Sequence, residues 1–126
     1  MKEFLIVGLG SFLGGGLRYA VAKLAMAIAP APFPLGTFLV NIIGCLVIGF
    51  VSALPLEGGL SPQTKLFLTT GFCGGFTTFS TFMNENYALV KDGNYMVLGL
   101  YIMGSLALGM AAVAAGHWIG KAFTAA

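Results

Sequence analysis

The chain has 126 residues, of which 58% are hydrophobic and only 8% are charged, and its formal net charge is +2. Soluble domains carry roughly 25% charged residues, so this composition excludes an ordinary soluble protein. A net charge this small gives no basic surface for nucleic acid, so no nucleic-acid partner is expected.

Four apolar segments are long enough to cross a bilayer as helices, which takes about 20 residues each. They occupy residues 3–29, 33–56, 63–90 and 94–122, and turn-forming residues separate them. The first segment is too long for a cleaved signal peptide and is followed directly by three more. The sequence therefore predicts an all-α membrane protein, with residues 1–126 forming a single four-helix domain. We expect a multi-pass protein of the cell membrane that is surrounded by lipid.

The basic residues give almost no orientation signal. With four crossings they divide evenly between the two sides, with Lys2, Lys65 and Lys121 on one and Arg18, Lys23 and Lys91 on or near the other. The positive-inside rule then predicts no fixed orientation, so the chain can insert both ways. Dual topology allows an antiparallel homodimer. A transport function would also most naturally require a dimer, because four helices alone rarely leave room for a transport pathway between them.

Small residues recur four positions apart in two segments. Gly10 and Gly14 form one such pair, and Gly116 and Gly120 form another. Pairs of this kind let helix backbones approach closely in lipid, where the hydrophobic effect does not drive helix association. They predict tight helix contacts, either within one subunit or between two.

Polar residues in the second and fourth segments share helix faces. Thr37 and Asn41 are four residues apart, as are Tyr101 and Ser105, and residues at this spacing are neighbours on a helix. An unpaired carboxamide buried in a membrane costs roughly a few kcal/mol, so Asn41 needs a partner. Asn41 is either a structural hydrogen-bonding residue or part of the lining of a pathway.

The stretch GFCGGFTTFSTF, residues 71–82, is unusual for a transmembrane helix. Gly74 and Gly75 are adjacent poor helix formers, and two threonines follow them. They predict a helix break over residues 74–77, near the middle of the membrane. Irregular backbone at that depth is tolerated only inside protein or beside a cavity. Carbonyl groups freed by the break would be suitable ligands for a hard cation such as sodium.

Phe79 and Phe82 lie three residues apart beyond this break. Such a pair either packs in the core or presents its ring edges, which carry partial positive charge, to an anion.

Several function classes lack their characteristic residues. No acidic residue, lysine or histidine lies near the centre of a segment, which disfavours a proton-coupled transporter. Paired acids, a nucleophile with its base and a phosphate-binding loop are also missing, so an enzyme is not expected. Hydroxyl groups, one amide and aromatic edges suit a small anion that needs strong hydrogen bonds. Fluoride fits this description best.

Three motifs support this interpretation: GGGLRY at 14–19, GTFLVNIIGC at 36–45 and GFCGGFTTFSTF at 71–82. With them the chain resembles the Fluc (CrcB-type) fluoride channels along essentially its whole length. The resemblance implies a passive, fluoride-selective channel that exports fluoride and reduces its toxicity. It also implies an antiparallel homodimer with two pores and a structural sodium ion at its centre.

The resemblance further implies roles for individual residues. The sodium ion would be held by the backbone carbonyls of Gly74 and Thr77 from each subunit. Arg18 matches a vestibule arginine, and Glu85 matches a position near the other mouth. Gly109 stands where the polar track of the last helix often has serine. The fluoride pore would be lined by Asn41, Phe79, Ser80, Thr81, Phe82, Tyr101 and Ser105.

Two alternatives belong to other classes of protein. A small multidrug-type exporter also has four short helices, but it needs a carboxylate within the first span, where the only one is Glu3 at its start. A structural subunit of a larger membrane complex would explain the glycine pairs. It would not explain a polar break flanked by Phe79 and Phe82.

Overall fold

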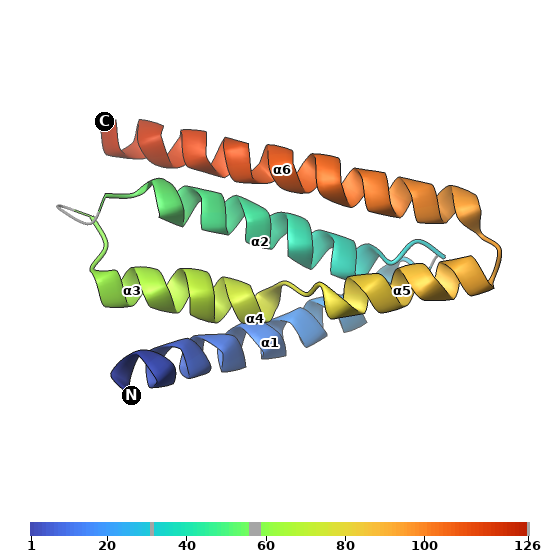
Figure 1. Cartoon of the computed structure of the whole chain (residues 1–126), viewed down its shortest axis with the longest axis horizontal. Coiled ribbons are helices and arrows are strands. Elements are labelled where there is room, and N and C mark those ends of the chain that lie inside the picture. Colours follow the sequence, from blue (N-terminus) through green and yellow to red (C-terminus); the bar gives the residue numbers. More distant parts are fainter. Residues whose placement is uncertain (31, 56–58, 126) are drawn as a thin grey trace.

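The computed structural model describes residues 1–30, 32–55 and 59–125, and these residues form helices and no strands. Three long helices are α1 (Lys2–Ile28), α2 (Leu35–Ala53) and α6 (Tyr95–Ala125). Between α2 and α6 lie four shorter pieces, α3 (Pro62–Leu66), the π-helix η1 (Phe67–Cys73), α4 (Gly74–Phe76) and α5 (Ser80–Lys91). The elements lie side by side in one bundle, with both termini at the same end (Figure 1). The expected all-α architecture is confirmed.

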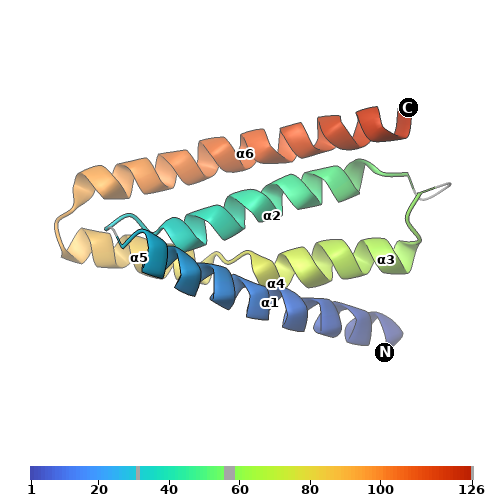
Figure 2. The same ribbon diagram turned by 180° about the vertical axis from the view of Figure 1, so that it is seen from behind.

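Three helices, α1, α2 and α6, are each long and apolar enough to cross a membrane. The remaining expected crossing is built from α3, η1, α4 and α5, which follow one another end to end beside the long helices (Figure 2). No single one of these pieces is long enough to span a bilayer by itself, since about 20 helical residues are required.

Local sequence explains where the shorter helices begin and end. Ser61 caps α3 by accepting a hydrogen bond from the Thr64 amide at 3.2 Å, and proline follows at the first helical position. At the other end of this crossing, Gly93 has a φ of 70° and ends α5. The Gly93 and Asn94 amides donate back to the carbonyls of Val90 and Leu89, respectively. This Schellman turn reverses the chain, so that α5 and α6 pack as antiparallel neighbours.

The two predicted glycine pairs both lie at helix contacts within the chain. A Cβ atom on Gly14 would overlap the carbonyl oxygen of Phe72 in η1, and one on Gly10 would come 2.8 Å from the carbonyl oxygen of Phe67. Gly116 and Gly120 of α6 approach the α2 backbone in the same way. The small residues therefore permit backbone-to-backbone packing that larger side chains would prevent.

Gly14→Ala is expected to destabilise the protein, and Gly16→Ala on the same helix is its matched control. The new methyl group at position 14 would meet the Phe72 backbone, whereas at Gly16 it would meet no described atom within 4 Å apart from its own stretch of helix. Overpacking of this kind costs roughly 1–3 kcal/mol. Thermal unfolding in detergent should therefore show a lower midpoint for Gly14→Ala alone. Equal midpoints for the two variants would mean that this contact does not hold α1 against η1.

The helical backbone is interrupted at Thr77–Phe79, so the expected position of the break, 74–77, is wrong at its start. Gly74 is helical, with φ −61° and ψ −38°, and Thr77 is the first extended residue. Close packing explains the glycine at 75, because a Cβ there would come 2.5 Å from the carbonyl oxygen of Ser11 in α1. Gly75 thus permits a helix contact rather than causing the break.

Candidate functional site: a polar groove beside the helix interruption

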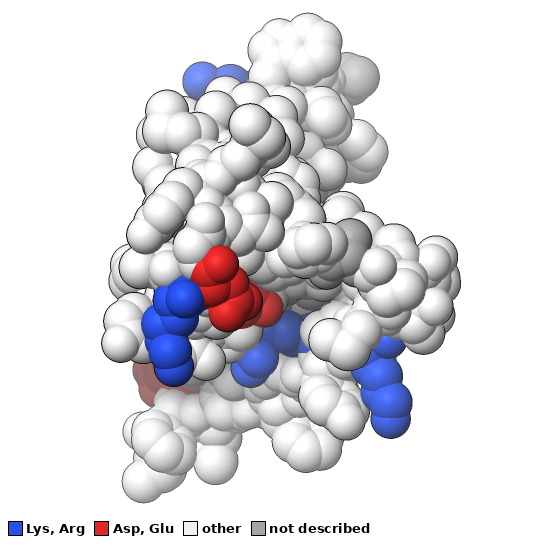
Figure 3. All heavy atoms as spheres, turned by 90° about the vertical axis from the view of Figure 1, so that its right-hand side faces the viewer, with Lys and Arg blue, Asp and Glu red and all other residues white. Residues whose placement is uncertain are grey.

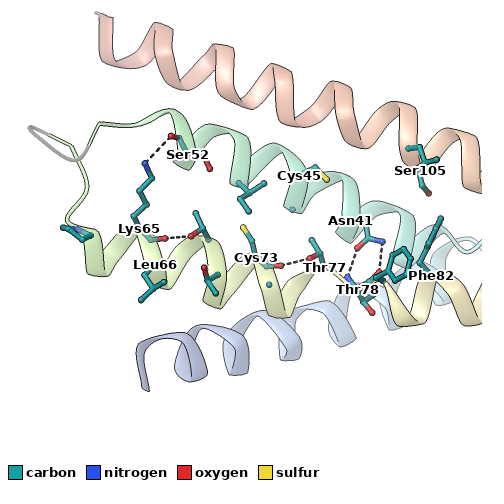
Figure 4. A pocket seen from close by; sticks show the side chains of 18 residues that line it. Asn41, Cys45, Ser52, Lys65, Leu66, Cys73, Thr77, Thr78, Phe82 and Ser105 are labelled. Carbon is teal, nitrogen blue, oxygen red and sulfur yellow. Dashed lines mark hydrogen bonds between the residues drawn. The ribbon is translucent and has the colours of Figure 1, made fainter. Parts of the chain in front are cut away.

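An open groove of about 1080 Å³ runs along α2 and the segmented crossing (Figure 4). It extends from Ser52 and Lys65 at one end to Phe82 and Ser105 at the other. Its lining includes six of the residues expected from the sequence to bind ions: Asn41, Gly74, Thr77, Phe79, Phe82 and Ser105. It does not include Arg18, Ser80, Thr81, Glu85 or Tyr101.

Asn41 holds the interrupted segment in place. Its Nδ2 donates to the carbonyl oxygen of Thr78 at 3.1 Å, and its Oδ1 accepts from the Thr78 amide at 2.8 Å. In a continuous helix the Thr78 amide would instead donate to the carbonyl of Gly74. The side chain of Asn41 therefore replaces helical hydrogen bonds, and it still has a second amide hydrogen beside the groove.

The interruption leaves hydrogen-bond acceptors next to the groove. Among the described residues, no hydrogen bond reaches the carbonyl of Gly74 or that of Thr77. The Thr77 hydroxyl donates to the carbonyl of Cys73 at 2.8 Å, so only its lone pairs remain available. Carbonyl and hydroxyl oxygens without donors suit a hard cation. The donor set here is thus compatible with sodium.

Phe79 and Phe82 have different environments although their ring centroids lie 6.2 Å apart. Phe79 is 73% exposed and lies at the interruption, where it lines the groove. Phe82 is only 7% exposed and packs against Tyr101, with ring centroids 4.9 Å apart. Phe82 therefore contributes to the core as well as to the groove, while Phe79 has little packing within the chain.

Ser105 presents a hydroxyl oxygen that is buried without a hydrogen-bond partner among the described residues. It lines the groove from α6, close to the end that also contains Phe82. A serine in a helix normally satisfies its hydroxyl on a carbonyl one turn back. Ser105 thus keeps an unused hydroxyl donor in the wall of the groove.

Glu85 lies at the centre of a separate polar cluster. It accepts hydrogen bonds from the Thr37 hydroxyl at 2.9 Å and from the Tyr101 hydroxyl at 2.7 Å, one on each carboxylate oxygen. Thr37 and Tyr101 are both buried, so helices α2, α5 and α6 meet at this carboxylate. Both hydroxyl hydrogens point at Glu85, and neither is available to another anion while these bonds persist.

Glu85 also lines a second cavity of about 430 Å³, beneath the connection between α1 and α2. This cavity lies at the end of the bundle that holds the α5–α6 turn. Most of the surface at that end is uncharged, and the charged side chains there form a few small patches (Figure 3). Glu85 therefore connects the buried hydroxyl cluster with an end of the bundle.

The other expected residues lie around the interruption. Arg18 donates from Nε to the carbonyl of Gly75 at 3.0 Å, so its charged group lies beside α4. The Thr78 hydroxyl donates to the Thr81 hydroxyl at 3.1 Å and accepts from the Thr81 amide, near the start of α5. Ser80 is exposed. These contacts organise the backbone on both sides of the interruption.

Over residues 5–117 the chain matches the family described as CrcB-like protein, Camphor Resistance (CrcB). The chain belongs to the CrcB family. Its resemblance to this family, inferred from the three motifs, is thereby confirmed. Together with the three apolar helices, membership identifies a multi-pass membrane protein.

Three similar relatives are each named fluoride-specific ion channel FluC. The relative from Chlorobium phaeobacteroides is 48% identical over 125 residues, which cover 98% of this chain and 96% of the relative. The relative from Chlorobaculum tepidum is 49% identical over 122 residues, 96% of each chain. The relative from Bacteroides fragilis is 45% identical over 127 residues, 98% of this chain and 99% of the relative. These names describe ion channels and not enzymes.

Several contacts that organise this protein were not expected from the sequence. No role was expected for Thr78, yet it provides the backbone partner of Asn41. Thr37 and Asn41 were paired by spacing, whereas the Thr37 hydroxyl contacts Glu85, 48 residues away. An acidic residue in an apolar segment is the signal that could have prompted a search for such donors.

Proposed function

We propose that this protein is a fluoride-selective channel through which fluoride leaves the cytoplasm passively, which reduces fluoride toxicity. The observation that carries the proposal is the groove at the helix interruption, where Asn41 and Ser105 offer uncommitted donors in a mostly uncharged lining. The relatives named as fluoride-specific channels support the same conclusion.

Fluoride is small and strongly hydrated, so a narrow pore must replace its water with donors already in position. Asn41 meets this requirement because its two bonds to Thr78 fix the amide, and its remaining N–H is directed by that fixed plane. Ser105 adds a hydroxyl, and Phe79 adds a ring whose edge carries partial positive charge. A neutral lining of this kind stabilises the anion without holding it so tightly that it cannot leave.

We propose further that two copies assemble in antiparallel orientation and enclose two pores. The groove is open along one side in a single chain, and Phe79 at its edge is 73% exposed, so a second copy would complete the lining. The even division of basic residues supports dual topology. Lipid would cover the outer faces of α1 and α6, which expose large apolar side chains such as Phe12 and Trp118.

A structural sodium ion fits at the centre of this dimer. Gly74 and Thr77 would hold it through their backbone carbonyls, to which no described residue donates. The bound ion would supply a fixed positive charge that joins two interrupted segments. The Gly74 carbonyl stays available because the Thr78 amide, which would bind it in a continuous helix, donates to Asn41 Oδ1 instead.

Phe79→Ile and Phe82→Ile are expected to separate pore chemistry from packing. Both remove a ring edge while keeping an apolar side chain, so fluoride flux should fall by about tenfold, the equivalent of roughly 1.4 kcal/mol. Because Phe82 is buried and Phe79 is exposed, only Phe82→Ile should also lower the thermal unfolding midpoint. Flux measurements and unfolding scans on the purified variants check both statements. Normal flux in both variants would place the pore lining elsewhere.

Growth of a bacterial host that lacks its own fluoride exporter gives a simple test of the function. Expression of this protein should restore growth in medium containing fluoride, and it should not change resistance to cationic drugs. Drug resistance without fluoride resistance would favour a multidrug-type exporter instead.

A further inference from the structure

Lys65 is the charged side chain among the residues that line the groove. It lies near the start of the segmented crossing, at the end of the bundle that holds both chain termini (Figures 1 and 4). Its Nζ donates to the carbonyl oxygens of Ser52 at 3.2 Å and Leu54 at 3.0 Å, where α2 ends. The ammonium group is therefore held in a defined position at one end of a groove whose other described lining residues are uncharged.

These two hydrogen bonds fix the ammonium group without cancelling its charge. The carbonyls at a helix C-terminus are equivalent to roughly half a negative charge, whereas the lysine carries a full positive one. An ammonium group has three N–H donors, of which the α2 carbonyls take two. Within residues 1–30, 32–55 and 59–125, Nζ has these two hydrogen-bond partners, so one N–H and part of the charge remain for an anion at this end of the groove.

We propose that the positive charge of Lys65 raises the local concentration of fluoride at the end of the groove near the two chain termini, before the ion reaches Asn41. A fixed charge at the mouth of a channel with low-dielectric walls concentrates counter-ions there. A single partly offset charge close to an anion's path should change its local concentration by about two- to fivefold. This inference rests on the proposed fluoride channel function.

A purely structural role makes a different prediction. If Lys65 served only as a cap that ties α3 to the end of α2, its replacement would lower stability and the amount of active protein. It would not change how flux depends on fluoride concentration. An electrostatic role instead shifts the fluoride concentration that gives half-maximal flux, and the shift disappears when salt screens the charge.

The test compares Lys65→Gln with Lys65→Arg in liposomes containing the purified protein. Glutamine can still donate hydrogen bonds toward the α2 carbonyls but has no charge. Arginine keeps both the hydrogen-bond donors and the positive charge. Lys121→Gln removes a charge from an exposed lysine outside the groove and is the matched control. Initial flux is measured over a range of fluoride concentrations at about 0.01 M and about 1 M of an impermeant salt, where the Debye lengths are about 30 and 3 Å.

At low salt, Lys65→Gln should raise the half-maximal fluoride concentration about two- to fivefold, with the same maximal flux. At high salt the difference should vanish, and the arginine and Lys121→Gln proteins should match the unmodified protein throughout. An unshifted concentration dependence in Lys65→Gln overturns the inference.

The unmodified protein gives a second measurement if Lys65→Gln does not fold. Its own half-maximal concentration should rise between low and high salt, and a value independent of salt also overturns the inference. A complete lack of fluoride flux in the unmodified protein would instead reject the proposed function, and this inference with it.

Discussion

Asn41→Asp should reduce fluoride flux by at least about a hundredfold while the protein remains folded. A carboxylate keeps the acceptor for the Thr78 amide, but it places an oxygen against the Thr78 carbonyl where Nδ2 now donates. It also brings negative charge to the groove. Two like charges about 4 Å apart repel by roughly 4 kcal/mol at an effective dielectric constant of 20, and each 1.4 kcal/mol is about tenfold in rate.

Asn84→Asp is the control for this substitution, because Asn84 is exposed on α5 and does not line the groove. It makes the same chemical change and should leave flux near normal. Size-exclusion profiles and unfolding midpoints of both purified variants would separate loss of fold from loss of transport. Equal flux through Asn41→Asp and the unmodified protein would remove Asn41 from the pathway.

Locking the orientation of the chain should abolish activity completely. Pro30→Lys with Asp92→Lys adds positive charge at one end of the bundle, whereas Gln63→Lys with Ala122→Lys adds it at the other. The positive-inside rule then gives each double variant one orientation. An antiparallel dimer needs both orientations, so either variant alone should be inactive, and expression of the two together should restore fluoride resistance.

Reporters fused to the C-terminus provide the control for this experiment. In the unmodified protein they should be found on both sides of the membrane in comparable amounts, and in each locked variant on one side only. Full activity of a single locked variant would contradict the antiparallel arrangement.

The elements whose signal is local could be predicted from the amino-acid sequence. Apolar segments of about 20 residues identified α1, α2 and α6, because membrane helices satisfy their own backbone. The glycine pairs identified close helix contacts, because only missing side chains permit them. The spacing of Thr37 and Asn41 correctly marked a polar helix face, since both side chains make hydrogen bonds across the bundle.

What depends on tertiary contacts could not be predicted in the same way. Helix propensity predicted that the break begins at Gly74. Gly75 is nevertheless helical, and its lack of a side chain lets it pack against Ser11. The interruption begins instead at Thr77, beside Asn41. Propensity is a weak prior that tertiary contacts override. The contacts of Glu85 with Thr37 and Tyr101 join three helices, so no local pattern contains them.

Fluoride efflux from liposomes that contain only the purified protein tests the central claim most directly. A fluoride-selective electrode would record release of the ion down its gradient after the membrane potential is clamped at zero. We expect rapid fluoride release without any coupling ion or energy source, and little release of chloride under the same conditions. Equal release of chloride and fluoride, or no release of either, would contradict a fluoride-selective channel.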